Sequence, residues 1–227
     1  MKIVQQLKGI YRKVRGIRPV QKLNMDAERR FVFIHIPKNA GTSISKSLGF
    51  DKTYHTKIAQ VQQMLPKEQY EALFKFGIVR HPYDRFLSLY HYATANESFY
   101  HSALQPDQAR HGKHPNYEGL KEKSLQDCAR MLIADQLIIP NAYYIWAPQS
   151  EWLLDEDGKM GLDFMGRFEQ LSDDFQHILQ KLQRPPIQLP NYNASSNRGE
   201  HRQLDATTKS ILQEYYRTDF DLLDYTP

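Results

Sequence analysis

The chain has 227 residues, 41% of them hydrophobic and 12% aromatic, which is enough for an ordinary core and argues against intrinsic disorder. Its single cysteine, Cys128, excludes an intrachain disulfide and favours a reducing compartment. The net charge is +4, and neither an apolar run of about 18 residues nor the apolar core of a signal peptide is present, so we expect a cytoplasmic protein without a membrane-spanning helix.

The positive charge is concentrated in residues 1–30, which hold nine basic and two acidic side chains, a net charge of +7 that leaves −3 for the rest. Apolar residues recur at helical spacing from Ile3 to Ile17, which predicts a basic amphipathic helix. Such a helix can make peripheral contact with an anionic membrane through residues 1–18. The alternative is a helix that packs its apolar stripe on its own domain. We therefore separate a leader, residues 1–30, from a single domain at residues 31–227.

A βα unit is predicted at the beginning of this domain. Residues 31–36 (FVFIHI) form a nearly continuous apolar run, which is typical of a strand buried on both faces. The run ends in a turn at residues 37–41, and a helix is predicted at residues 42–48, where Thr42 or Ser43 can cap the first turn.

The next part of the chain repeats this order. A helix predicted at residues 58–65 ends before Pro66, and residues 74–79 form a second buried strand. A turn at residues 80–84 leads into a helix at residues 85–95. Strands that alternate with helices predict an α/β fold with a parallel sheet and helices on both sides.

The remaining chain is less regular. Residues 96–120 are polar, and we expect a long surface loop, a kind of segment that is more often functional than idle. A third strand is predicted at residues 162–168, and helices at residues 124–137, 172–182 and 205–216.

The turn after the first strand has the composition of a phosphate-binding loop. Its residues are Pro37, Lys38, Asn39, Ala40, Gly41, Thr42 and Ser43. Small residues let the backbone approach a ligand, N–H groups at a helix start attract anions, and Lys38 adds a positive charge. The order differs from the nucleoside-triphosphatase loop, G-x-x-x-x-G-K-[ST], because Lys38 precedes Gly41. A purely structural corner between strand and helix is the alternative.

A second candidate anion site follows the second strand. Arg80 lies at the strand's carboxyl end, where open α/β sheets bind ligands, and Ser88 lies two helical turns further along. An arginine can bind a phosphate bidentately, and a hydroxyl can add a hydrogen bond. Two such sites on adjacent βα units predict a ligand with phosphate groups at two separate positions.

At these residues the chain resembles the sulfotransferases that use 3′-phosphoadenosine 5′-phosphosulfate (PAPS), in particular the family 2-like branch that sulfates carbohydrates. Residues 33–44 (FIHIPKNAGTSI) are similar to the family's 5′-phosphosulfate loop, and residues 74–90 (FKFGIVRHPYDRFLSLY) to its 3′-phosphate motif. The resemblance continues through residues 148–175 and weakly beyond them. The chain has Asn39 where Thr is commoner and His81 where Asn is commoner, and neither difference removes a charge.

This resemblance implies a three-layer α/β sandwich with a central parallel sheet, of the P-loop type. It implies that residues 38–43 hold the 5′-phosphosulfate, that Arg80 and Ser88 hold the 3′-phosphate, and that Arg198 lies in a loop over the nucleotide. Lys38 would stabilise the leaving phosphate of the product, 3′,5′-ADP. No metal is expected, since fixed cations can stabilise the weakly charged sulfuryl group.

The acceptor hydroxyl must lose a proton, and histidine is the usual base near neutral pH. His55 lies between the two phosphate motifs, where hydroxyl-sulfating members of the family keep a catalytic histidine, so we expect His55 to be the base. A helix-capping or surface histidine is the alternative. His35, inside the first strand, is expected to be structural, and His81 is a second possible base.

These patterns predict an enzyme that moves a sulfuryl group from PAPS to a hydroxyl of a carbohydrate or glycoconjugate. One alternative is an ATP-dependent small-molecule kinase of the P-loop type, which would need Mg²⁺. Another is a non-catalytic module that binds an anionic glycan, and we expect no nucleic-acid partner. Trp146 and Trp152 can either line an acceptor groove or belong to the core.

Overall fold

The computed structural model describes residues 23–26, 28, 30–96, 98–102, 105–138, 144–189 and 204–227. The amphipathic helix and the membrane contact expected within residues 1–18 lie outside the described residues, and so does Arg198.

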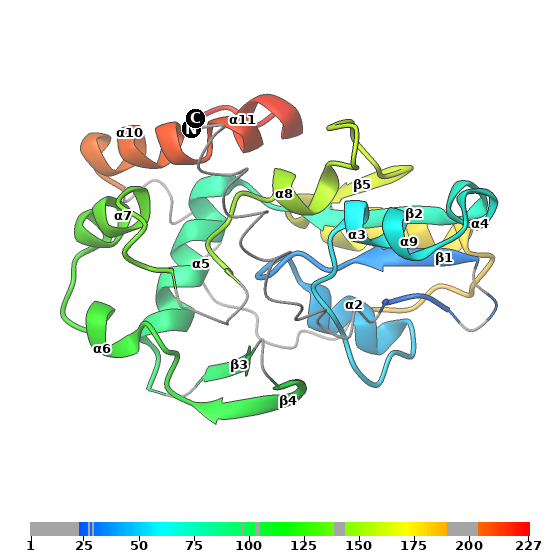
Figure 1. The fold of residues 1–227 in the computed structure, drawn as a ribbon, viewed down its shortest axis with the longest axis horizontal. Coiled ribbons are helices and arrows are strands. Elements are labelled where there is room, and N and C mark those ends of the chain that lie inside the picture. The colour runs from blue at the N-terminus through cyan, green and yellow to red at the C-terminus, as the bar shows by residue number, and fades with distance from the viewer. Residues whose placement is uncertain are drawn as a thin grey trace.

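The centre of the fold is a three-stranded parallel sheet with the order β1-β2-β5. Its strands are β1 (Phe31–Ile34), β2 (Phe74–Val79) and β5 (Phe164–Arg167). Phe31 lies opposite Phe74, and Phe76 lies opposite Phe164. The three predicted strands and the α/β class are confirmed, and the carboxyl ends of all three strands meet at one edge of the sheet (Figure 1).

Helices surround the sheet and extend beyond its carboxyl edge (Figure 1). In chain order they are α2 (Gly41–Ser47), α3 (Ile58–Met64), α4 (Lys67–Ala72), α5 (Pro82–Thr94), α6 (Tyr117–Leu120), α7 (Leu125–Ile133), α8 (Ser150–Leu153), the 3-10 helix η1 (Phe168–Gln170), α9 (Leu171–Lys181), α10 (Ala206–Tyr215) and α11 (Arg217–Leu223). Each helix predicted within residues 31–227 is confirmed within a few residues, whereas α4, α6, α8 and α11 are additional.

Successive side chains of a strand point to opposite faces of the sheet, and helices cover each face, so both faces are buried. On one face Phe33 and Phe76 stack with their ring centroids 5.3 Å apart, and they pack with α2 and α9. On the other face Val32 and Ile34 pack with α3 and α8. Helices on both faces of a parallel sheet make the three-layer sandwich that the resemblance implies.

A second core lies beyond the carboxyl edge of the sheet, where α5, α7, α10 and α11 pack around Phe86, Trp146 and Tyr216. Trp146 is 1% exposed, and Trp152, which packs in the sheet core, is 2% exposed. Both tryptophans therefore belong to the core.

The expectation that residues 96–120 form a long surface loop is wrong. The segment contains an antiparallel hairpin of β3 (Ser98–Ser102) and β4 (Gln105–Gly112), followed by α6. Main-chain hydrogen bonds are enough to pair two polar strands, and such strands lack the alternation of apolar residues by which a strand is recognised in a sequence.

Part of the segment assigned to the leader contacts the sheet. The side-chain amide of Asn24 donates to the carbonyl oxygens of Phe33, at 3.0 Å, and Tyr54, at 2.6 Å. Met25 forms an antiparallel bridge with Val32. Residues 23–26 thus pack against β1.

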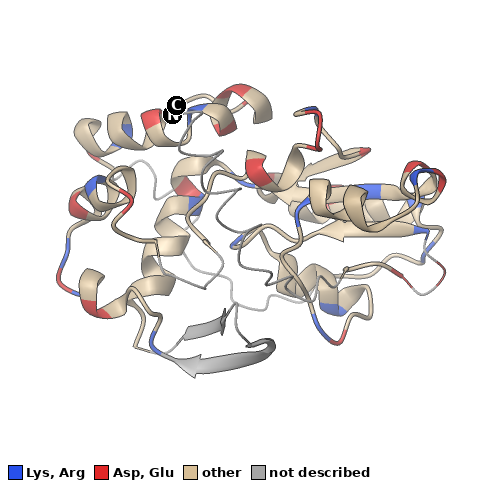
Figure 2. Cartoon of the chain, viewed as in Figure 1, with Lys and Arg blue, Asp and Glu red and all other residues tan. Residues whose placement is uncertain are grey.

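The described surface carries acidic and basic side chains interspersed over its helices and loops (Figure 2). None of the helices in the described ranges is both long and apolar enough to cross a membrane.

Candidate functional site

The loop between β1 and α2 has an unusual backbone. Lys38 (φ 70°) and Ala40 (φ 60°) are both left-handed, with one residue between them. Left-handed residues at such spacing turn backbone N–H groups toward one side, which makes a concavity suited to an anion. Ala40 is the N-cap of α2 and no side chain caps this helix, so the expected capping by Thr42 or Ser43 is wrong.

Gly41 is needed here because the ring of His35 occupies the space beside it. A Cβ atom on Gly41 would lie 1.8 Å from Cδ2 of His35. The ring cannot move aside easily, since Nδ1 lies 2.6 Å from Oγ1 of Thr53 and the ring stacks on Phe33. His35 is buried, which agrees with the structural role expected for it.

Lys38 is partly buried, and its ammonium nitrogen lies over the ring of Tyr92 on α5, 4.5 Å from the ring centre. The pKa of Lys38 is lowered to about 8, mainly by burial and to a smaller extent by the positive charge of Arg80. Two cations are therefore held near each other, and an anion bound between them would relieve their repulsion.

Arg80 directly follows the last residue of β2 and is 4% exposed. Its Nη1 donates to the carbonyl oxygen of Lys38 at 3.3 Å, and its guanidinium lies over the ring of Phe168, 4.2 Å from the ring centre. The two candidate anion sites are thus side by side, as a single ligand with two phosphate groups requires. Ser88 is partly exposed on α5.

Asn39 contributes to the loop in a way that the sequence did not indicate. Its side chain is buried, and Nδ2 donates to the carbonyl oxygen of Ile78, at 2.8 Å, and to Oε1 of Gln149, at 2.6 Å. The Asn39 side chain therefore ties the candidate anion loop, residues 37–43, to β2 and to the segment before α8.

Arg85 and Asp219 also hold the site, and the sequence patterns did not single them out. Arg85 is buried on α5, and its guanidinium donates to three backbone carbonyl oxygens, those of Pro37 at 3.1 Å, Ala147 at 2.9 Å and Ile145 at 2.8 Å. Asp219 is buried on α11, where burial raises the pKa of its carboxyl group. Arg85 lies within the sequence motif after β2, but only the structure shows that it points inward.

His55 lies beside His35, with the ring centroids 4.1 Å apart. Its Nδ1 lies 2.8 Å from the carbonyl oxygen of His35. A carbonyl oxygen can only accept, so Nδ1 carries the hydrogen, and the neutral ring has its lone pair on Nε2. This is the tautomer that a base acting through Nε2 needs. The N-cap of α3 is Lys57, so His55 is not a helix cap.

His81 uses both ring nitrogens within the protein. It is the N-cap of α5, where Nδ1 accepts from the backbone N–H of Tyr83 at 3.3 Å. Nε2 lies 3.1 Å from the carbonyl oxygen of Thr226, to which it must donate. These contacts favour a structural role over the role of a second base.

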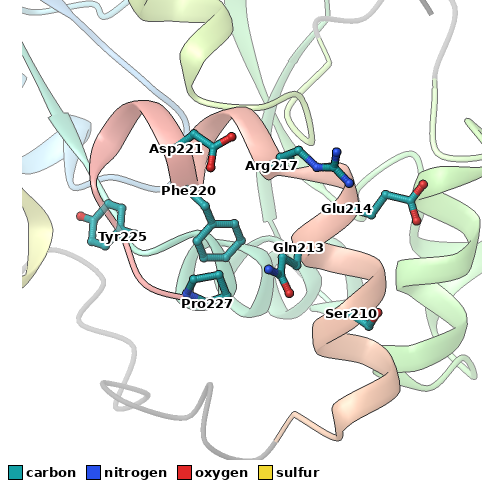
Figure 3. Close-up of a pocket in the computed structure, with 8 residues that line it drawn as sticks. All are labelled: Ser210, Gln213, Glu214, Arg217, Phe220, Asp221, Tyr225 and Pro227. Carbon is teal, nitrogen blue, oxygen red and sulfur yellow. The ribbon is translucent and has the colours of Figure 1, made fainter.

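Two further features concern binding. In the described part of the chain, no group of three or more His, Cys, Asp or Glu side chains is arranged to hold a metal ion. An open hollow of about 380 Å³ lies on α10 and α11 (Figure 3). It is lined by Ser210, Gln213, Glu214, Arg217, Phe220, Asp221, Tyr225 and Pro227. None of the site residues expected from the sequence lines it.

The family model of the "Sulfotransferase family" matches residues 21–226, nearly the whole chain. The chain belongs to the sulfotransferase family. No curated protein and no solved structure matches it. Membership makes the protein a transferase of sulfuryl groups and assigns its three-layer sandwich to the P-loop type of fold.

Alanine substitutions at Gly41 and at Gly119 test the packing of His35 on the loop of this sulfotransferase. We expect Gly41→Ala to lower the free energy of unfolding by about 1–3 kcal/mol, because the new methyl group displaces the His35 ring. Gly119→Ala is the control, since a Cβ atom there meets open space in α6 and alanine favours a helix by up to about 1 kcal/mol. Urea unfolding measures both. Equal stability of the two variants would contradict the packing of His35 on Gly41.

Proposed function

We propose that this sulfotransferase takes its sulfuryl group from PAPS and transfers it to a hydroxyl of a carbohydrate or glycoconjugate. The observation that carries the proposal is the contact between the guanidinium of Arg80 and the carbonyl oxygen of Lys38. It brings two cationic loops together at the carboxyl ends of neighbouring parallel strands, where α/β folds bind nucleotides. PAPS has anionic groups on the 5′ and 3′ carbons of one ribose, so one molecule can occupy both loops.

The residues present fit this donor. The left-handed backbone at Lys38 and Ala40 and the absence of a side chain at Gly41 allow close approach of an anionic group. PAPS supplies a sulfuryl group whose bond to the 5′-phosphate oxygen breaks as the bond to the acceptor oxygen forms, which leaves 3′,5′-ADP. Lys38 stabilises the negative charge that develops on the departing phosphate.

His55 supplies the remaining function in this mechanism. Nε2 takes the proton of the attacking hydroxyl, and the hydrogen bond from Nδ1 to the carbonyl oxygen of His35 keeps the ring in the required tautomer. The backbone beside the ring is held too, because Nε1 of Trp152 donates to the carbonyl oxygen of His55 at 3.2 Å. Fixed donor and base reduce the entropy cost of reaching the transition state.

The acceptor class is supported by the resemblance of both loop motifs to the branch of the family that sulfates carbohydrates. A cytoplasmic location and a membrane contact through residues 1–18 remain predictions from the sequence.

Thermal unfolding with nucleotides tests the donor. We expect 3′,5′-ADP at 100 times its dissociation constant to stabilise the protein by about 2.7 kcal/mol, because it binds only the folded state. ATP with Mg²⁺ at the same concentration should produce a smaller shift, since ATP lacks the 3′-phosphate. Stabilisation by ATP with Mg²⁺ but not by 3′,5′-ADP would instead support a P-loop kinase.

The lowered pKa of Lys38 predicts proton uptake on binding. At pH 8 the ammonium group of the free protein is about half deprotonated, and a bound anion raises its pKa, so binding of 3′,5′-ADP should take up roughly half a proton. The dissociation constant should therefore rise as the pH increases above about 8. Calorimetry in buffers of different ionisation enthalpy measures the uptake. Lys38→Arg should abolish it, and equal uptake in this variant would exclude Lys38 as the source.

Replacement of His55 tests the base. We expect His55→Ala to lower kcat by about 10²- to 10⁴-fold while the dissociation constant of 3′,5′-ADP stays within about twofold. His177→Ala, on the exposed side of α9, is the matched control and should change neither. Release of 3′,5′-ADP from PAPS, with an acceptor that the wild-type protein sulfates, measures kcat. Near-normal turnover of His55→Ala would remove His55 from the mechanism.

A further inference from the structure

The side chain of Gln149 contacts both anion loops and is completely buried, at 0% exposure. Its Oε1 accepts from Nδ2 of Asn39 at 2.6 Å and from the backbone N–H of Arg80 at 3.0 Å. Its Nε2 donates to the carbonyl oxygen of Arg80 at 2.7 Å. A single amide thus joins the loop after β1 to the loop after β2.

The Gln149 side chain pairs with the backbone of Arg80 in the way that a neighbouring strand would. The pairing of β1 with β2 ends at Ile34 and Gly77, three residues before Arg80. Beyond that point the amide of Gln149 offers one acceptor and one donor to the two main-chain groups of Arg80, as the backbone of a paired strand does. The backbone of Arg80 is therefore held in place after its neighbour β1 has ended.

Gln149 is itself fixed from the opposite side. Its backbone N–H donates to Oδ2 of Asp219 at 2.8 Å, and the N–H of Ser150 donates to Oδ1 at 2.8 Å. Asp219 is buried on α11. The position of the Gln149 amide is therefore set by the core and does not depend on a ligand.

We infer that Gln149 is a positioning residue that sets the spacing between the two anion sites, through the side chain of Asn39 on one loop and the backbone of Arg80 on the other. The inference rests on the proposed function, because a donor with two separated anionic groups is the ligand that senses this spacing. When one group is bound, the second site acts at a high effective concentration only if the spacing fits. Loosening the junction removes this advantage and leaves each site able to bind a single phosphate.

The test divides the dissociation constant of 5′-AMP by that of 3′,5′-ADP. This ratio is large when the second phosphate strengthens binding and approaches one when it does not. Gln149→Met keeps the length of the side chain and removes all three of its hydrogen bonds. We expect the ratio to fall at least tenfold in this variant, whereas the dissociation constant of 5′-AMP changes less than threefold. Calorimetric titration gives both constants.

Tyr216→Phe is the matched control. It removes a buried hydrogen bond, from the Tyr216 hydroxyl to the carbonyl oxygen of Trp146 at 3.0 Å, without touching either loop. The ratio should stay at the wild-type value in Tyr216→Phe. It would stay there in Gln149→Met as well if Gln149 only stabilised the fold. If Gln149→Met does not fold, Asn39→Ala breaks the same junction at its other end and should lower the ratio as well.

The outcomes separate the inference from the proposed function. A wild-type protein that binds 3′,5′-ADP no better than 5′-AMP overturns the proposed donor and the inference with it. A clear wild-type advantage that persists in Gln149→Met, or in Asn39→Ala where Gln149→Met does not fold, overturns the inference alone.

Discussion

The carboxyl edge of the sheet depends on one buried cation, Arg85. Arg85 is 1% exposed, and its guanidinium donates to the carbonyl oxygens of Pro37, Ile145 and Ala147. A buried charge without such partners would cost several kcal/mol, so the three carbonyl groups are held where the guanidinium requires them. Because Pro37 begins the anion loop and Ala147 lies two residues before Gln149, this side chain positions both the loop and the residue that joins it to β2.

The positive charge of Arg85 also supports Asp219, whose pKa it lowers against the larger, opposite effect of burial. Asp219 in turn holds the backbone at Gln149 and Ser150. The anion loops are thus anchored to α11, near the end of the described chain, through a network of buried polar groups that satisfy one another. Such a network holds the candidate binding site rigidly, as the proposed transfer between two bound reactants needs.

The sequence predicts the strands and proposes the two candidate anion loops because each is a local pattern, an apolar run that ends in a turn of small or charged residues. The residues that hold the loops together have no such pattern. Gln149 contacts Asn39 across 110 positions of the chain and Arg80 across 69, and a glutamine that takes the place of a strand looks like any other glutamine. The side-chain hydrogen bonds of Asn39 are missed for the same reason, since they too join segments that are far apart in the chain. The β3–β4 hairpin is missed because polar strands show no apolar alternation.

Lys38 and Arg80 pose an electrostatic problem, since the fold holds two cations close together and partly out of water. Aromatic rings offset part of this cost, with Tyr92 under the ammonium and Phe168 under the guanidinium. Each such contact contributes about 0.5–1 kcal/mol, and more when water is excluded. A carboxylate would stabilise either cation further, but it would also neutralise the charge and compete with an anionic ligand. A ring leaves the positive charge of either side chain available, so this arrangement gives up some stability and keeps the charge that the proposed donor needs.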